Sequence, residues 1–229
     1  MRKKAIVLLS GGLDSTTVLG IAQREEYELY TLCFDYGQRH QREVEAANAV
    51  ARYYQVQRQQ TVKIDLRVFG GSALTADIAV PHERNFDEMS HEIPITYVPA
   101  RNTIFLSYAL AYAEVTGAND MFLGINAIDY SGYPDCRPAY LEAFERMANL
   151  ATKAAVQDGR EFRIHAPLMH MNKAEIIRKG LESGVPYELT WSCYEGEELA
   201  CGTCDSCVLR LNGFAEVGVK DPLKYVPIA

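Results

Sequence analysis

A short stretch rich in glycine and serine, near the start of the chain, has the residue types that bind phosphate. It reads Ser10-Gly11-Gly12-Leu13-Asp14-Ser15 and lies between an apolar run at 5–9 and a helix-forming run at 16–22. Its glycines let the backbone approach a ligand closely, and the following helix presents free N–H groups and the positive end of its dipole. Serine and threonine hydroxyls in and after the stretch add further hydrogen-bond donors. We therefore expect a strand, a tight turn and a helix that together bind an anion.

Asp14 stands where the common ATPase loop carries a lysine, and the residue spacing of that loop is absent. A carboxylate beside bound phosphates is repulsive unless it caps the helix or shares a Mg²⁺ ion with them. The hexapeptide resembles the pyrophosphate loop of the N-type ATP pyrophosphatase (PP-loop) superfamily, whose members cleave ATP between the α and β phosphates and adenylate a substrate. The alternative interpretation is a glycine turn that Asp14 and Ser15 cap.

Strand and helix patterns alternate along the chain, which predicts an α/β fold with a parallel sheet and right-handed crossovers. The predicted strands are 5–9, 28–34, 58–64, 119–124 and 162–166, and the predicted helices are 16–22, 43–54, 103–116, 139–156, 172–184 and 206–214. We divide the chain into an α/β domain at 1–185 and a small C-terminal zinc-binding region at 186–229. A polar segment at 70–100 is long enough to be an insertion or a lid.

Length and charge limit the classes of partner. The 229 residues are 48% hydrophobic, which suffices for a buried core, and the net charge of −7 argues against a large basic surface for nucleic acid. We therefore expect small-molecule substrates and no nucleic-acid partner. No apolar stretch has the length that crosses a bilayer, and the short apolar run behind the basic start lacks a cleavage site. We expect no membrane association and a cytoplasmic location.

Two arginines lie where an anion would be expected. Arg39 follows the second predicted strand, and the carboxyl ends of parallel strands are where open sheets bind ligands. It contacts phosphate or adenine, or else belongs to a solvated helix start. Arg101 lies at the start of the predicted helix at 103–116, where its charge opposes the helix dipole. Its partner is then an α-phosphate, a substrate carboxylate or a surface carboxylate.

The loop after the fourth predicted strand has the side chains that stack on and hydrogen-bond a purine-like ring. It carries Tyr133, Asp135 and Arg137 within the sequence Tyr130-Ser131-Gly132-Tyr133-Pro134-Asp135-Cys136-Arg137. The Asp135 carboxylate could accept hydrogen bonds from an N–H pair such as a guanine edge presents. The same turn is equally well interpreted as the capped entry to a helix.

Four of the six cysteines crowd together near the C-terminus. Cys193, Cys201, Cys204 and Cys207 have the spacing C-x₇-C-x₂-C-x₂-C, and four thiolates satisfy a tetrahedral Zn²⁺ ion with no open position. The site is then structural, and an iron–sulfur cluster is the alternative. Cys33 lies in an apolar strand and is expected in the core, whereas a chemical role for Cys136 stays open.

These motifs, taken in order, resemble the 7-cyano-7-deazaguanine synthase (QueC) family of the PP-loop superfamily. The resemblance covers nearly the whole chain and includes the segments at 34–40, 130–137, 166–169 and 173–176 together with the four cysteines. It implies a Rossmann-like fold of the adenine nucleotide alpha hydrolase type, with helices on both sides of the sheet. One departure is Ala100, where the family usually has glycine, and this places the local backbone angle in question.

The resemblance implies a C–N bond-forming ligase of queuosine biosynthesis that makes 7-cyano-7-deazaguanine (preQ0) from 7-carboxy-7-deazaguanine, free ammonia and ATP. The carboxylate and then the amide would be adenylated, with Mg²⁺-pyrophosphate leaving each time. The implied ATP-binding residues are Leu9, Ser10, Gly11, Gly12, Leu13, Asp14, Ser15, Thr16, Thr17, Val18, Leu19 and Arg39. The implied catalytic residues are Asp14, Arg101 and Lys173, and the implied substrate residues are Tyr133, Asp135 and Arg137.

The resemblance also implies a homodimer with ATP, Mg²⁺ and a structural Zn²⁺ as its ligands. The alternatives are another PP-loop synthetase, a tRNA thiolase, or a non-catalytic zinc module that binds nucleotide. The acidic chain has no appended RNA-binding segment, which weakens the case for a thiolase.

Overall fold

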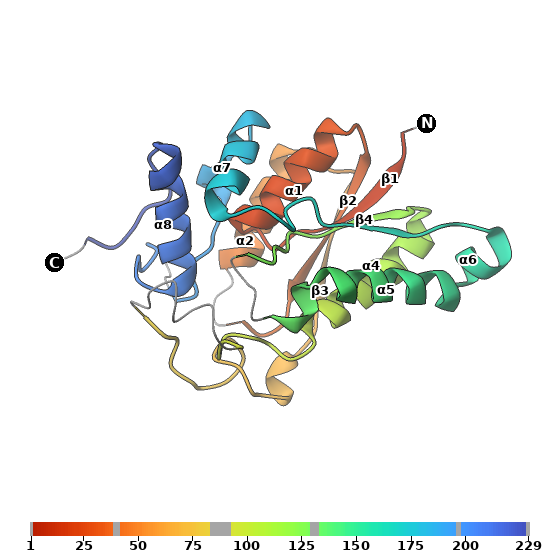
Figure 1. Ribbon diagram of the computed structural model, residues 1–229, viewed down its shortest axis with the longest axis horizontal. Coiled ribbons are helices and arrows are strands. Elements are labelled where there is room, and N and C mark those ends of the chain that lie inside the picture. The colour runs from red at the N-terminus through yellow and green to blue at the C-terminus, as the bar shows by residue number, and fades with distance from the viewer. Residues whose placement is uncertain (1, 39–41, 83–92, 129–132, 196–197, 228–229) are drawn as a thin grey trace.

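Five parallel strands form one sheet at the centre of the computed structural model (Figure 1). The strands are β1 (Lys4–Leu8), β2 (Glu28–Asp35), β3 (Arg58–Lys63), β4 (Asp120–Phe122) and β5 (Arg163–His165). Their order across the sheet is β3-β2-β1-β4-β5, and each neighbouring pair is parallel. The structure describes residues 2–38, 42–82, 93–128, 133–195 and 198–227. The predicted five-stranded parallel sheet is confirmed, although β4 and β5 are shorter than expected.

Helices cover both faces of this sheet (Figure 1). The helices are α1 (Leu13–Arg24), α2 (Arg42–Tyr53), α4 (Arg101–Thr116), α5 (Pro138–Ala151), α6 (Lys153–Asp158), α7 (Lys173–Glu182) and α8 (Asp205–Val217), with short 3₁₀ turns at Leu66–Val68, Pro134–Cys136 and Tyr187–Leu189. None of the helices that the structure describes is both long enough and apolar enough to span a membrane.

The two faces follow from the alternation of side chains along each strand. In β1, Ala5 and Val7 pack into one buried cluster with side chains of α1, α2 and α7. Ile6 packs into a second cluster with side chains of α4 and α5, because successive side chains of a strand point to opposite faces. The sheet is therefore the middle one of three layers.

The strand order reverses between β1 and β4. The helix after β1 covers one face of the sheet, whereas the helix after β4 covers the other face. Open parallel sheets bind ligands beyond the carboxyl ends of their strands at such a reversal. After β4, a Cβ atom at Gly124 would come within 2.8 Å of the Ser15 amide nitrogen. The chain segments that follow the two strands therefore meet where a ligand site is expected.

The helix predicted at 139–156 is two helices, and this part of the prediction is wrong. Thr152 is extended (φ −105°, ψ 145°) and separates α5 from α6. Its hydroxyl donates to the Ala148 carbonyl at 3.0 Å and accepts from the Ala155 amide at 3.4 Å. A threonine side chain that replaces backbone partners in this way ends one helix and caps the next.

The C-terminal region packs against the α/β core, mainly through contacts between α8 and α7. The polar segment predicted as an insertion or lid joins this region. Ala73 and Val80 share a buried cluster with the cysteines, and His82 forms an antiparallel bridge to Cys204. The part of the predicted lid at 83–92 lies outside the described residues, so the structure reports only on the parts that flank it.

Candidate active site

The loop between β1 and α1, residues 9–12, has the conformation that an anion site requires. Gly11 has φ +85°, and a Cβ atom there would come within 2.4 Å of the Glu43 carbonyl oxygen and the Ala47 amide nitrogen. Glycine is therefore required, because α2 packs directly on the loop. Gly12 is the N-cap of α1 and makes no side-chain cap hydrogen bond, so backbone N–H groups of the first turn are available to a ligand.

Serine hydroxyls stiffen this loop from within. The Ser10 and Ser15 hydroxyl oxygens lie 3.0 Å apart. The Ser15 hydroxyl also donates to the Gly12 carbonyl at 3.2 Å, and the Gly12 amide donates to the Ser10 hydroxyl at 3.2 Å. These contacts shape the turn before any ligand binds, and both hydroxyls can reorient toward an anion.

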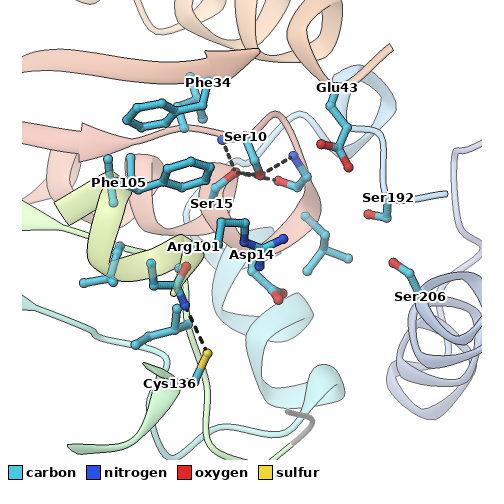
Figure 2. A pocket seen from close by; sticks show the side chains of 18 of the residues that line it. Ser10, Asp14, Ser15, Phe34, Glu43, Arg101, Phe105, Cys136, Ser192 and Ser206 are labelled. Carbon is cyan, nitrogen blue, oxygen red and sulfur yellow. Dashed lines mark hydrogen bonds between the residues drawn. The ribbon is translucent and has the colours of Figure 1, made fainter. Parts of the chain in front are cut away.

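The loop forms one wall of a cavity of about 220 Å³ beyond the carboxyl ends of the central strands (Figure 2). Phe34 and Phe105 stack in another wall, with ring centroids 3.9 Å apart and ring planes 2° apart. The charged and serine side chains of the lining belong to Ser10, Asp14, Ser15, Glu43, Arg101, Lys173, Ser192, Ser206 and Arg210. Apolar walls with a few convergent polar groups are typical of a site for a small molecule.

The three residues predicted to be catalytic all line this cavity. The Lys173 ammonium donates to both carboxylate oxygens of Asp14, each at 2.8 Å. The stem of Lys173 packs against α8, where a Cβ atom at Gly213 would come within 2.7 Å of the Lys173 Cγ atom. The glycine in α8 therefore leaves room for the lysine that faces the pyrophosphate loop.

Arg101 occupies the first position of α4, and its guanidinium points into the cavity (Figure 2). Burial works against the charged form of Arg101, yet the surrounding acidic groups outweigh burial and raise the pKa of the guanidinium above its usual value. Its positive charge opposes the dipole of α4. The arginine is thus a cation that faces the cavity.

Only some of the residues predicted to bind ATP line the cavity. Leu9, Ser10, Gly12, Leu13, Asp14 and Ser15 line the cavity, and Gly11 shapes the loop. Thr16, Thr17, Val18 and Leu19 are buried in α1 and are absent from the cavity lining. The Thr17 hydroxyl lies 2.8 Å from the Tyr187 hydroxyl. Arg39 lies outside the described residues.

Likewise, only some of the residues predicted to bind the substrate ring line the cavity. Tyr133 lines the cavity, and its hydroxyl lies 2.9 Å from the Thr96 hydroxyl. The Asp135 carboxylate accepts from the Asn102 amide at 3.0 Å, in the first turn of α4, and it is absent from the cavity lining. Arg137 is exposed, directly before α5, and is also absent from the lining. Asp135 therefore holds the helix start that carries Arg101.

Several cavity residues were missed in the sequence. Glu43 resembles any acidic residue near a helix start, and Ser192 and Ser206 are inconspicuous beside the cysteines. Burial raises the pKa of the Glu43 carboxyl to about 7, although Arg101 acts in the opposite direction. Cys136 also lines the cavity, and burial raises the pKa of its thiol to about 12, so it is protonated at neutral pH and a poor nucleophile.

The sulfur atoms of the four C-terminal cysteines lie within 4.8 Å of one another. The Cys201 and Cys207 sulfurs are 3.9 Å apart, close to the separation of about 3.8 Å that follows from tetrahedral Zn–S bonds of about 2.3 Å. Backbone amides donate to the Cys193 sulfur, and hydrogen bonds from the Cys204 and Cys207 thiols hold the pKa of Cys193 well below its usual value. The donor set fits one tetrahedral metal ion.

Two connections join this cluster to the cavity. The Trp191 amide donates to the Gly11 carbonyl at 2.9 Å, two residues before the first cysteine of the cluster. Arg210, in α8, pairs with Asp221 through bonds of 2.8 and 2.9 Å and donates to the Ser192 hydroxyl at 3.3 Å. The C-terminal region therefore supports the pyrophosphate loop from behind.

Known proteins share both the sequence and the fold of this chain. It is 61% identical over 227 residues to a 7-cyano-7-deazaguanine synthase of Kineococcus radiotolerans, a match that covers 98% of this chain and 99% of the relative. It is 57% identical over 225 residues to a synthase of the same name from Thermoplasma volcanium, covering 98% and 92%. The solved structure of a predicted subunit of tRNA methyltransferase from Methanocaldococcus jannaschii is similar in fold, with a TM-score of 0.50, 16% identity and coverage of 98% and 92%.

Residues 4–218 match the family model described as "Queuosine biosynthesis protein QueC". The family that the sequence motifs indicated is thereby confirmed. A model match over most of the chain, together with identities of 57% and 61% to full-length relatives, shows that the chain belongs to the QueC family.

Proposed function

We propose that the chain makes 7-cyano-7-deazaguanine from 7-carboxy-7-deazaguanine, ammonia and ATP. The observation that carries this proposal is the convergence of Asp14, Lys173 and Arg101 on one cavity beside the pyrophosphate loop. A carboxylate cannot expel oxide when ammonia attacks it, so its oxygen must first be joined to AMP. A site for this chemistry needs a cradle for the leaving pyrophosphate and cations for the charge that develops.

The loop residues and the two cations have separate roles in adenylation. Backbone N–H groups at the start of α1 and the hydroxyls of Ser10 and Ser15 bind the pyrophosphate that leaves. Lys173 donates to its oxygens, and Arg101 faces the α-phosphate or the substrate carboxylate. Mg²⁺, when bound, neutralises phosphate charge, and the Asp14 carboxylate is the residue that would hold it. After ammonia gives the amide, the same groups serve a second adenylation, and loss of AMP and a proton leaves the nitrile.

The deazaguanine ring is proposed to lie against the aromatic part of the cavity. Tyr133 and the stacked pair Phe34 and Phe105 offer ring faces there. Asp135 acts through the start of α4, where it accepts from the Asn102 amide. Arg137 is also proposed to contact the ring, from the exposed end of this loop, since its side chain is absent from the cavity lining.

The product of the reaction tests this function. The purified chain is incubated with ATP, Mg²⁺, 7-carboxy-7-deazaguanine and ¹⁵N-ammonium, and the products are weighed by mass spectrometry. We expect a nitrile that carries one ¹⁵N atom, together with AMP. Binding of ATP without any release of AMP would instead identify a non-catalytic nucleotide module.

The cysteine cluster is proposed to hold one structural Zn²⁺ ion, since four thiolates leave no open coordination position. Metal analysis should return about one zinc per chain. A brown protein that absorbs near ~400 nm would identify an iron–sulfur cluster instead. Cysteines outside disulfides are typical of a reducing compartment, which supports the proposal of a cytoplasmic location.

A homodimer is the proposed assembly. Apolar side chains on the outer surfaces of α4 and α5 are exposed, and Val115 and Leu150 are the most exposed of them, at 84% and 79%. A second copy of the chain would cover this surface. Sedimentation velocity should show a dimer for the wild type and a monomer for Leu150→Glu.

A further inference from the structure

Glu43, Ser192 and Ser206 lie together on the side of the cavity that faces the C-terminal region (Figure 2). Glu43 is the second residue of α2, Ser206 is the second residue of α8, and Ser192 lies between Trp191 and Cys193. Elements from both ends of the chain therefore bring one carboxylate and two hydroxyls to the same edge of the cavity.

Of the two carboxylates that line the cavity, only Asp14 has an ion-pair partner among the described residues. Asp14 is paired with Lys173 at 2.8 Å. Among the residues that the structure describes, none forms an ion pair or a hydrogen bond with the Glu43 carboxylate. ATP, pyrophosphate and a substrate carboxylate are all anions, and a second carboxylate repels each of them. Arg101 is the cation of the lining that acts on this carboxyl, but no side chain among the described residues hydrogen-bonds to it, so its oxygens can accept from a ligand that carries N–H donors.

The position of Glu43 is fixed by the pyrophosphate loop itself. The close approach of α2 to Gly11 sets its backbone, since a Cβ atom on that glycine would come within 2.4 Å of the Glu43 carbonyl oxygen. Ser192 is fixed from the other side. The amide of the preceding residue, Trp191, donates to the Gly11 carbonyl, and the Ser192 hydroxyl accepts from Arg210. The Glu43 backbone and the Ser192 side chain are therefore held in place relative to the loop before α1.

We infer that Glu43, with the hydroxyls of Ser192 and Ser206, binds the ammonium ion that supplies the nitrile nitrogen, and that its carboxylate takes the proton that ammonium must lose. This inference rests on the proposed function. Ammonium is the main form of ammonia at neutral pH, and it carries four N–H donors and no lone pair. A carboxylate and two hydroxyls offer acceptors for these donors. The raised pKa of Glu43, about 7, suits a group that accepts a proton and then releases it.

The step balances in atoms and electrons. One proton passes from ammonium to the Glu43 carboxylate, which leaves a lone pair on nitrogen. That pair attacks the carbonyl carbon of the acyl adenylate and forms the C–N bond. The bond between this carbon and the AMP oxygen breaks, and AMP leaves with the bonding pair. The nitrogen loses a second proton to water as the amide forms, and Glu43 later returns its proton to water.

A divalent cation is the competing occupant, and the structure favours ammonium over it. Asp14 lies at the first turn of α1, beside the amides that would hold pyrophosphate, and a Mg²⁺ ion shared with pyrophosphate belongs there. Glu43 lies on the side of the cavity that carries the two serines (Figure 2). Hydroxyl groups are ordinary partners for N–H donors.

The test compares two substrates in the Glu43→Gln variant, which keeps the side-chain shape and removes the charge. With 7-carboxy-7-deazaguanine, we expect the KM for ammonium to rise by about 10- to 100-fold, because a hydrogen bond to a charged group is lost. With 7-amido-7-deazaguanine, which needs no ammonium, the rate should stay within about twofold of the wild type. Glu45→Gln is the matched control, since Glu45 is exposed on the same helix and pairs with Arg42.

Two outcomes would overturn the inference. An equal loss with both substrates would make Glu43 a structural residue, and a raised KM for ATP or a raised Mg²⁺ requirement would make it a metal ligand. If Glu43→Gln fails to fold, Ser206→Ala provides the same comparison, with an expected rise of about threefold to tenfold in the KM for ammonium. No nitrile from either substrate with the wild-type chain would refute the proposed function, which is a different result.

Discussion

Asp14 and Lys173 form a partly buried ion pair at the pyrophosphate loop, with both oxygens of the carboxylate at 2.8 Å from the ammonium. Such a pair contributes little net stability, because desolvation of both charges offsets their attraction. Its value lies in what each partner can do when ligands arrive. In the proposed adenylation, a cation and a phosphate would separate the two charges and give each a new partner.

Asp14→Asn should therefore reduce turnover much more than stability. We expect kcat to fall by about 100-fold or more, because the variant lacks the carboxylate charge that acts while pyrophosphate leaves. The free energy of unfolding should fall by about 1–3 kcal/mol, because Lys173 loses its charged partner. The double variant Asp14→Asn/Lys173→Met should recover stability but not turnover. Full turnover per folded molecule in Asp14→Asn would make the residue a structural cap.

Residues of the loop were recognisable in the sequence because their types and spacing are local. Glu43 was not, because its role depends on the packing of α2 against Gly11, which brings a common helix-start residue into the cavity. Asp135 was recognised as important, but its partner was open in the sequence. The structure pairs its carboxylate with the Asn102 amide, a contact between residues 33 positions apart.

At the scale of elements, the start of α4 is a strained point. Its N-cap residue, Ala100, has a left-handed backbone conformation with φ 53° and ψ 21°. A Cβ atom makes this conformation unfavourable by about 1–2 kcal/mol. Two hydrogen bonds stabilise this conformation. The Tyr97 hydroxyl accepts from the Ala100 amide at 3.1 Å, and the Asp135 carboxylate accepts from the Asn102 amide in the first turn of α4. The helix start that carries Arg101 is thus fixed in spite of its backbone.

Ala100→Gly should stabilise the chain. Glycine removes the strain but adds freedom to the unfolded state, so we expect a net gain of about 0.5–1 kcal/mol in the free energy of unfolding. Denaturant unfolding monitored by circular dichroism measures this change. Ala143→Gly is the matched control in the exposed middle of α5, where it should cost about 1 kcal/mol. A loss of stability in Ala100→Gly would show that the strain is absent.

The five strands and most helices could be predicted because apolar periodicity is a local signal. The break between α5 and α6 could not, since the apolar pattern continues through Thr152 while its hydroxyl competes for backbone partners. The order of the strands could not be predicted either, because it is set by packing of elements far apart in the chain. The reversal of this order beside Gly124 was therefore not visible in the sequence.

In the whole molecule, hydrogen bonds join the C-terminal region to the pyrophosphate loop. Trp191 is the single tryptophan of the chain, and it lies between the two. Its amide donates to the Gly11 carbonyl and its indole donates to the Cys193 carbonyl at 3.1 Å. Metal at the cysteines should therefore influence nucleotide binding without contacting the nucleotide.

Removal of the metal should change both the surroundings of Trp191 and the affinity for ATP. In Cys204→Ser, or after chelation, we expect the emission of Trp191 to shift to the red as its buried site opens, and the affinity for ATP to fall by at least about tenfold. Cys33→Ala is the control, because Cys33 is buried in the core and lies outside the cluster. A red shift at unchanged ATP affinity would contradict the connection.

One cavity is proposed to adenylate the substrate twice. The most direct measurement is the ratio of AMP to nitrile, with 7-carboxy-7-deazaguanine and 7-amido-7-deazaguanine as alternative substrates. Because the proposed ring contacts are remote from the reacting carbon, both should be accepted. We expect two AMP for each nitrile from the carboxylate, and one AMP for each nitrile from the amide without added ammonium. An inert amide, equal AMP ratios for the two substrates, or ADP in place of AMP would contradict the proposal.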